Sequence, residues 1–237
     1  PTTLYRDVTP RPVESVSGRS LVVVEKETDA TGLHFGHDTA LTPEHADWPA
    51  MVLAMTAFGE HRQSHGRLYQ ALRATRGLNY GDYAAVGIYR QAGWSSEREP
   101  ASDRLSNPFY VWIRPVDAVN GPFALKAAVA MVEDFAAEGL TEDEFTVMQR
   151  YLSGRISLWA ADPGRRLAYA TAAASMGWDD PLVTLPAQIE ALTLDAVNAA
   201  VARHIRPADL RMVAVTGDGA AFIDAVTAEV LSLIHIS

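Results

Sequence analysis

The order of strand-like and helix-like runs constrains the fold of this chain more than any single motif. Residues 122–204 carry helical patterns only. Runs that are β-branched or alternate in polarity lie on both sides of that stretch, at residues 18–27, 32–39, 80–90, 107–116 and 209–218. Such segregation predicts an α+β fold, with helices covering a mostly antiparallel sheet.

Local signals set the expected boundaries at the start of the chain. The first two runs are separated only by the turn-like TDAT, which predicts that they pair as a hairpin. Asp47 is predicted to cap a helix that has Pro49 in its first turn. A second helix should begin near Ser64 and end at Gly77, with Leu68 and Leu72 facing inward.

Further caps occur in the helical stretch. Thr141 and Glu144 have the spacing of a capping box, and Thr193 can cap the helix that begins at Leu194. Gly139 is expected to end the helix before the capping box.

Composition indicates one folded domain. The chain has 237 residues, of which 48% are hydrophobic and 21% charged, so a sizeable core is expected. No internal repeat or second linker is visible, which predicts a domain over residues 18–230. The proline-rich residues 1–17 are predicted to be a linker. Residues 231–237, LSLIHIS, resemble a translated sequencing adapter and are predicted to be a non-native tail.

Charge and residue usage exclude several classes of function. A net charge of -9 and a pI of about 5.2 argue against nucleic-acid binding driven by phosphate contacts. No apolar run approaches the roughly 20 residues that cross a bilayer, so no membrane span is expected. The absence of cysteine excludes disulfides and thiolate metal sites.

Three segments together resemble the pitrilysin/insulinase (inverzincin) zinc peptidases, which include mitochondrial processing peptidase. They read GRSLVVVEKETDATGLHFGH, ADWPAMVLAMTAFGEHRQSHGRLYQALR and ALRATRGLNYGDYA. The resemblance covers about residues 18–230. It implies the LuxS/mitochondrial-processing-peptidase-like metallohydrolase fold.

In that family the peptidase is assembled from two homologous halves, and one half carries H-x-x-E-H and a distant Glu that bind zinc. H-x-x-E-H is absent here. LTPEH, ending at His45, and AFGEH, ending at His61, both lack the first histidine. The resemblance therefore implies the inactive half, with no cofactor of its own and with zinc in a partner half, either in the same chain or in a separate subunit.

The resemblance also implies that Arg73 and Tyr80 contact the peptide substrate, because the family's second half has an Arg and a Tyr at this seven-residue spacing. Peptide hydrolysis places negative charge on the carbonyl oxygen, which a fixed guanidinium or phenol can stabilise. The alternative is that Arg73 is a solvated helix residue and Tyr80 a half-buried strand aromatic.

Other histidine pairs are weaker candidates. His61 and His65 have i,i+4 spacing but lie in a polar segment, so a solvated pair is expected. His34 and His37 should lie on opposite faces of a strand.

We therefore expect this chain to bind unfolded peptide for a zinc-bearing half, and to be inactive alone. The alternative functions are a structural assembly subunit of the same fold and an independent hydrolase. The resemblance favours a periplasmic location.

Overall fold

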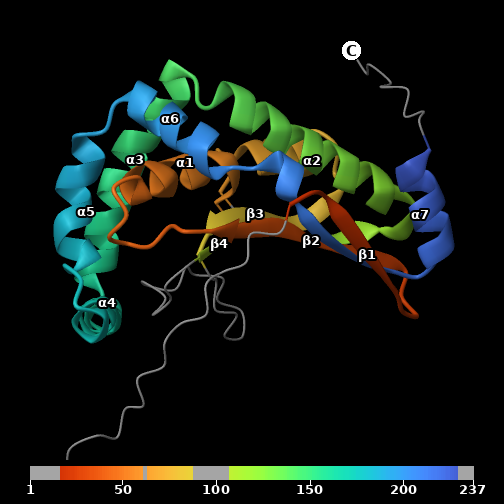
Figure 1. Cartoon of the computed structure of the whole chain (residues 1–237), viewed down its shortest axis with the longest axis horizontal. Helices are drawn as coiled ribbons and strands as arrows, with labels where there is room; N and C mark the ends of the chain where they lie inside the picture. The colour runs from red at the N-terminus through yellow and green to blue at the C-terminus, as the bar shows by residue number, and fades with distance from the viewer. Residues whose placement is uncertain (1–16, 61–62, 88–106, 229–237) are drawn as a thin grey trace, which may run out of the picture.

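The computed structural model describes residues 17–60, 63–87 and 107–228, which form a five-stranded sheet with helices gathered on one side (Figure 1). The strand order is β1-β5-β2-β4-β3, in which the β1–β5 pair is parallel and the other pairs are antiparallel. The predicted α+β class with a mostly antiparallel sheet is confirmed. The strands are β1 (Ser20–Glu25), β2 (Ala30–Thr39), β3 (Asn79–Val86), β4 (Asn107–Asp117) and β5 (Arg211–Thr216).

The predicted hairpin of the first two strands is wrong. β5 lies between β1 and β2, where Val213 pairs with Val22 on one side and with His34 on the other. The intervening turn passes the end of β5, since the Lys26 N–H donates to the Thr216 carbonyl at 2.9 Å. A strand from the far end of the chain thus occupies the position that sequence proximity assigned to β2.

The helices follow the predicted order. They are α1 (Trp48–Gly59), the π-helix η1 (Tyr69–Ala74), α2 (Gly121–Glu138), α3 (Glu142–Ala161), α4 (Pro163–Met176), α5 (Pro181–Glu190), α6 (Leu194–His204) and α7 (Gly219–Thr227). Short 3-10 turns, η2 (Ala118–Asn120) and η3 (Pro207–Asp209), precede α2 and β5.

The predicted caps of α3 and α6 are confirmed. The Thr141 hydroxyl accepts the Glu144 N–H, and the Glu144 carboxylate accepts the Thr141 N–H. Thr193 accepts the Ala196 N–H at 3.2 Å. Gly139 ends α2 with a φ of 68°, a conformation that glycine adopts without strain.

The predicted cap of α1 is only half correct. Asp47 does hold the N-cap position, and Pro49 lies in the first turn, but the Asp47 side chain makes no capping hydrogen bond. It contacts Arg203 and His204 at the end of α6 instead. Contact with two cationic or protonatable partners replaced the local hydrogen bond that the sequence suggested.

The core lies between the sheet and the helices. Every residue of α1 is buried, and Phe58 near its end stacks on Phe135 of α2 with ring centroids 4.5 Å apart. Inward side chains alternate along the strands, as Leu33 and Phe35 do on β2. The helical layer therefore fixes one face of the sheet and leaves the other to a separate set of side chains.

Several predictions fall on residues outside the described ones. They include most of the linker over residues 1–17, the tail over residues 231–237, His61 and the end of the strand run beyond Gly87. These stay predictions.

Candidate functional site

The segment that carries Arg73 runs from a helix into edge strand β3. Its last turns form the π-helix η1, in which the Thr75 N–H donates to the Gln70 carbonyl five residues back, at 3.0 Å. Gly77 then adopts a φ of 62°, and its N–H donates to the Arg73 carbonyl at 2.8 Å. This left-handed turn reverses the chain, as predicted, so that β3 runs back past the helix end.

The structure brings Arg73 and Tyr80 together. The guanidinium carbon of Arg73 lies 4.8 Å from the centroid of the Tyr80 ring and 5.2 Å from that of Tyr69. Both distances fall within the range of cation–π attraction. Tyr80 is 61% exposed, so this pair stands at the surface, where a ligand can reach it. Their contact with substrate stays a prediction.

A buried carboxyl group, Asp82, supports the pair and was missed by sequence reasoning. Asp82 is only 2% exposed, and the Asn79 amide donates to its Oδ2 at 2.9 Å. Burial raises the pKa of Asp82, while the Asn79 hydrogen bond and the charge of Arg73 act in the opposite direction. The available signal was an acidic residue within the apolar alternation of a strand, beside Ala84 and Val86.

An ion pair anchors the same helical segment to α3. Arg67 donates through Nε to Glu144 Oε1 at 2.6 Å and through Nη2 to Oε2 at 2.5 Å. Nη2 also donates to the Gly139 carbonyl at 2.8 Å, and the guanidinium lies 5.4 Å from the centroid of Phe135. Burial alone would raise the pKa of Glu144, but hydrogen bonds from Arg67 and from Thr141 hold it below its usual value. The bidentate pair fixes the helix on which Arg73 lies.

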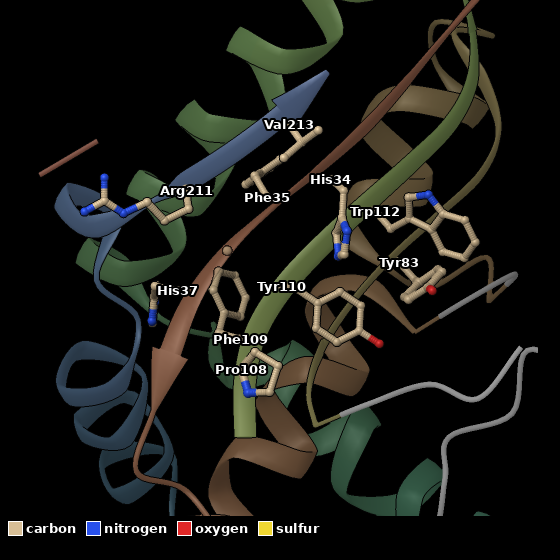
Figure 2. Close-up of a pocket in the computed structure, with 11 residues that line it drawn as sticks. His34, Phe35, His37, Tyr83, Pro108, Phe109, Tyr110, Trp112, Arg211 and Val213 are labelled. Carbon is tan, nitrogen blue, oxygen red and sulfur yellow. The ribbon is translucent and has the colours of Figure 1, made fainter. Parts of the chain in front are cut away.

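A hollow of about 760 Å³ lies on the sheet (Figure 2). Most of the side chains that line it are aromatic or imidazole rings from neighbouring strands, among them His34 of β2, Tyr83 of β3, and Tyr110 and Trp112 of β4. The Tyr83 ring lies edge-on to those of Tyr110 and Trp112, at centroid distances of 5.8 and 4.9 Å. The rings form a continuous apolar wall with polar atoms at its edge.

Gly36 lines the hollow at a close crossing of the strands. It pairs with Tyr110 on one side and Arg211 on the other, and both of these line the space. A Cβ at Gly36 would lie 2.0 Å from the Phe109 carbonyl oxygen, so no other residue fits at this crossing. Arg211 also lines the hollow, which is otherwise mostly apolar.

The group around Glu60 does not fit a catalytic zinc ion. The Glu60 carboxylate, which begins the EH of AFGEH, lies 3.3 Å from Arg155 Nε and 3.7 Å from His65 Nε2. A guanidinium at that carboxylate opposes a dication, and His61 lies outside the described residues. Tyr151 lies beside this group, and its pKa is raised to about 12, mainly by burial and secondly by the negative charge of Glu60.

The histidines of β2 also fail to converge. His34 is exposed on one face of the strand, while His37 is 5% exposed on the other and accepts the Arg206 N–H at 3.0 Å. The prediction of opposite faces is confirmed. No step of zinc chemistry is assigned to this half.

Similarity to known proteins decides how this geometry is interpreted. No family model matches the sequence. An uncharacterized zinc protease of Mycobacterium tuberculosis (strain H37Rv) is 28% identical over 186 residues, which cover 78% of this chain and 38% of that protein. The chain thus spans well under half the length of the curated relatives it matches.

Solved structures share the fold. A peptidase M16 inactive domain from Pseudomonas fluorescens matches with a TM-score of 0.67 and 18% identity, over 85% of this chain and 44% of that one. A protease from Helicobacter pylori matches with a TM-score of 0.71 and 13% identity, over 90% and 48%. The chain is therefore similar in sequence to a zinc protease and shares its fold with peptidase M16 inactive domains.

A third similarity concerns an inactive peptidase domain from Bordetella parapertussis, with a TM-score of 0.60 and 15% identity over 81% of this chain and 92% of that one. The fold of this chain thus matches that domain over almost its full length. Among residues 17–60, 63–87 and 107–228, no helix is both long and apolar enough to cross a bilayer.

Proposed function

We propose that this chain is the substrate-binding, non-zinc half of a metalloendopeptidase, and that Arg73 and Tyr80 contact the peptide near the scissile bond. The observation that carries the proposal is the convergence of the two side chains, 4.8 Å apart at the surface, in a fold shared with inactive peptidase domains. We also propose the periplasm as its location.

Zinc in the partner half would supply the Lewis acid for hydrolysis, and this half would supply position and charge. The Arg73 guanidinium can donate to the carbonyl oxygen as negative charge develops there, and the Tyr80 hydroxyl can donate to the same group or to a neighbouring amide. The flanking rings of Tyr69 and Tyr80 hold the guanidinium by cation–π attraction, and the charge of Arg73 is close enough to Asp82 to act on its pKa. A donor held in this way loses little entropy when the substrate binds.

The aromatic hollow suits the binding of apolar side chains of the peptide. Apolar walls with a few polar groups at the edge are typical of sites that receive side chains of a bound ligand. Tyr83 lies three residues along β3 from Tyr80, so the two side chains leave the strand on opposite faces, and the hollow is a surface separate from the Arg73–Tyr80 pair. We assign apolar side chains of an unfolded peptide to this hollow.

The test measures kcat and KM of the assembled enzyme, with its zinc-bearing half, on an unstructured fluorogenic peptide. Arg73→Ala should lower kcat on the order of 100- to 1000-fold, as loss of a transition-state donor does. Tyr80→Phe should lower kcat as well, and Trp112→Ala should mainly raise KM. Arg76→Ala is the matched control, because Arg76 is exposed and donates only locally, to the Ala71 carbonyl at 2.7 Å.

Unchanged hydrolysis by Arg73→Ala and Tyr80→Phe would show that the assigned roles are wrong. An assembled protein that cleaves no unstructured peptide, even with added zinc, would instead favour a structural subunit of the same fold.

A further inference from the structure

Three side chains from two distant parts of the chain meet where α1 begins and α6 ends. His45 lies in the loop after β2, Asp47 immediately precedes α1, and His204 is the last residue of α6. One potential ligand atom from each lies within 4.8 Å of the other two. The rings of His45 and His204 are edge to face, with centroids 5.0 Å apart. Small side-chain rotations would therefore bring three ligand atoms to one point.

Asp47 serves this cluster rather than its own helix. An aspartate at an N-cap normally accepts a hydrogen bond from the first turn, which is worth about 1 kcal/mol. Here that bond is absent, and Asp47 Oδ2 lies 2.6 Å from His204 Nε2. The backbone N–H of Asp47 donates to His45 Nδ1 at 3.1 Å, which orients that ring against the same carboxylate.

The ligand types favour a cation. Two imidazoles and one carboxylate form a donor set that suits Zn²⁺ and neighbouring transition-metal ions.

We propose that His45, Asp47 and His204 bind a divalent transition-metal ion, with Zn²⁺ as the preferred ion, and that this ion ties the start of α1 to the end of α6. When the ion binds His204 Nε2, the proton that this nitrogen shares with Asp47 Oδ2 moves to Nδ1, so that Nε2 presents its lone pair to the ion. Water completes the coordination. The site departs from the sequence-based expectation that this half holds no metal.

Arg203 is the competitor for the site. Its guanidinium hydrogen-bonds the same Asp47 oxygen that faces His204. The Arg203 side chain is 57% exposed, so it can swing into solvent when an ion arrives. Its positive charge nevertheless opposes the ion, which means that removing the charge should strengthen metal binding.

The test titrates the EDTA-treated chain with Zn²⁺ by calorimetry, and with Co²⁺ while recording its visible absorption. We expect one ion per site and a cobalt band characteristic of nitrogen and oxygen ligands. His45→Ala should weaken binding by more than about tenfold, since loss of even an outer-shell partner costs 10- to 100-fold. Arg203→Gln should bind at least as tightly as the original chain. His34→Ala is the control, because His34 is an exposed histidine on β2, outside the cluster.

No saturable Zn²⁺ binding would overturn the proposal, as would equal affinities of the original chain and His45→Ala. Asp47→Asn provides a second variant, because asparagine remains a good N-cap and α1 should still form. Its metal affinity must also fall. None of these measurements requires peptide hydrolysis, so their outcome is independent of the proposed function.

Discussion

Replacing Glu144 should loosen the helix that carries Arg73. Glu144 accepts two hydrogen bonds from Arg67 and two from Thr141, and its side chain is only 31% exposed. Removing a partly buried charged pair of this kind costs about 1.5–3 kcal/mol, and losing a capping box adds about 1. With a discount for exposure, Glu144→Ala should lower the free energy of unfolding by about 2–3 kcal/mol.

Urea denaturation followed by circular dichroism measures this loss, which corresponds to a fall in Tm of roughly 4–12 °C in a protein of this size. Glu144→Gln should cost less, because the amide oxygen can still accept the Thr141 N–H. A double-mutant cycle with Arg67→Ala isolates the pair and should give a coupling energy above about 1 kcal/mol.

Acid should remove the same contribution. The folded-state pKa of Glu144 is lowered, so its stabilisation is present above the unfolded pKa of about 4.3 and is lost as pH falls through the folded value. The difference between the original chain and Glu144→Gln should therefore shrink below about pH 4. A coupling energy near zero, or a difference independent of pH, would refute the reasoning.

Four further variants test other parts of the structure by the same denaturation assay. Gly77→Ala should lower the free energy of unfolding by about 1 kcal/mol, because Gly77 has a positive φ. Gly154→Ala should raise it by about 0.5–1 kcal/mol, because Gly154 lies in a helix with open space around it. A change of the same sign in both variants would contradict this reasoning. Phe58→Ala should cost about 3–5 kcal/mol, since the ring is fully buried against Phe135, and a loss below 1 would contradict that packing. The raised pKa of Asp82 means that the folded state holds its proton more tightly, so stability falls as pH rises through the folded pKa. The free energy of unfolding of Asp82→Asn, relative to that of the original chain, should therefore rise between pH 4 and pH 7. A difference between the two proteins that does not change with pH would argue against the raised pKa.

Features encoded by adjacent residues were predictable from the sequence. The capping box of Thr141 and Glu144 and the turn at Gly77 each depend on a few neighbouring residues, and the structure contains both. The same holds for the approach of Arg73 and Tyr80, because the Gly77 turn lies between them.

Features that depend on distant residues were not predictable. The position of β5 between β1 and β2 depends on strands almost 200 residues apart, and nothing in TDAT distinguishes a hairpin turn from a turn around a third strand. Asp47 looked like a local cap because its true partner, His204, is 157 residues away. The position of the acidic residue Asp82 within a strand could be predicted from the sequence. Its interaction with Arg73 could not, because that depends on how the helix and the strand pack.

The anchor and the proposed site lie on one short helical segment, and this separates two explanations of lost activity. Arg67 and Arg73 both precede the Gly77 turn, so weakening the Arg67–Glu144 pair displaces the Arg73 guanidinium without altering its charge. Activity lost through such displacement should be proportional to the loss of stability. It should recover when a tightly bound peptide orders the helical segment that carries Arg67 and Arg73. Activity lost in Arg73→Ala should not recover, because the donor itself is missing. A direct role of Arg73 therefore requires a loss of kcat larger than that of Glu144→Gln at equal stability.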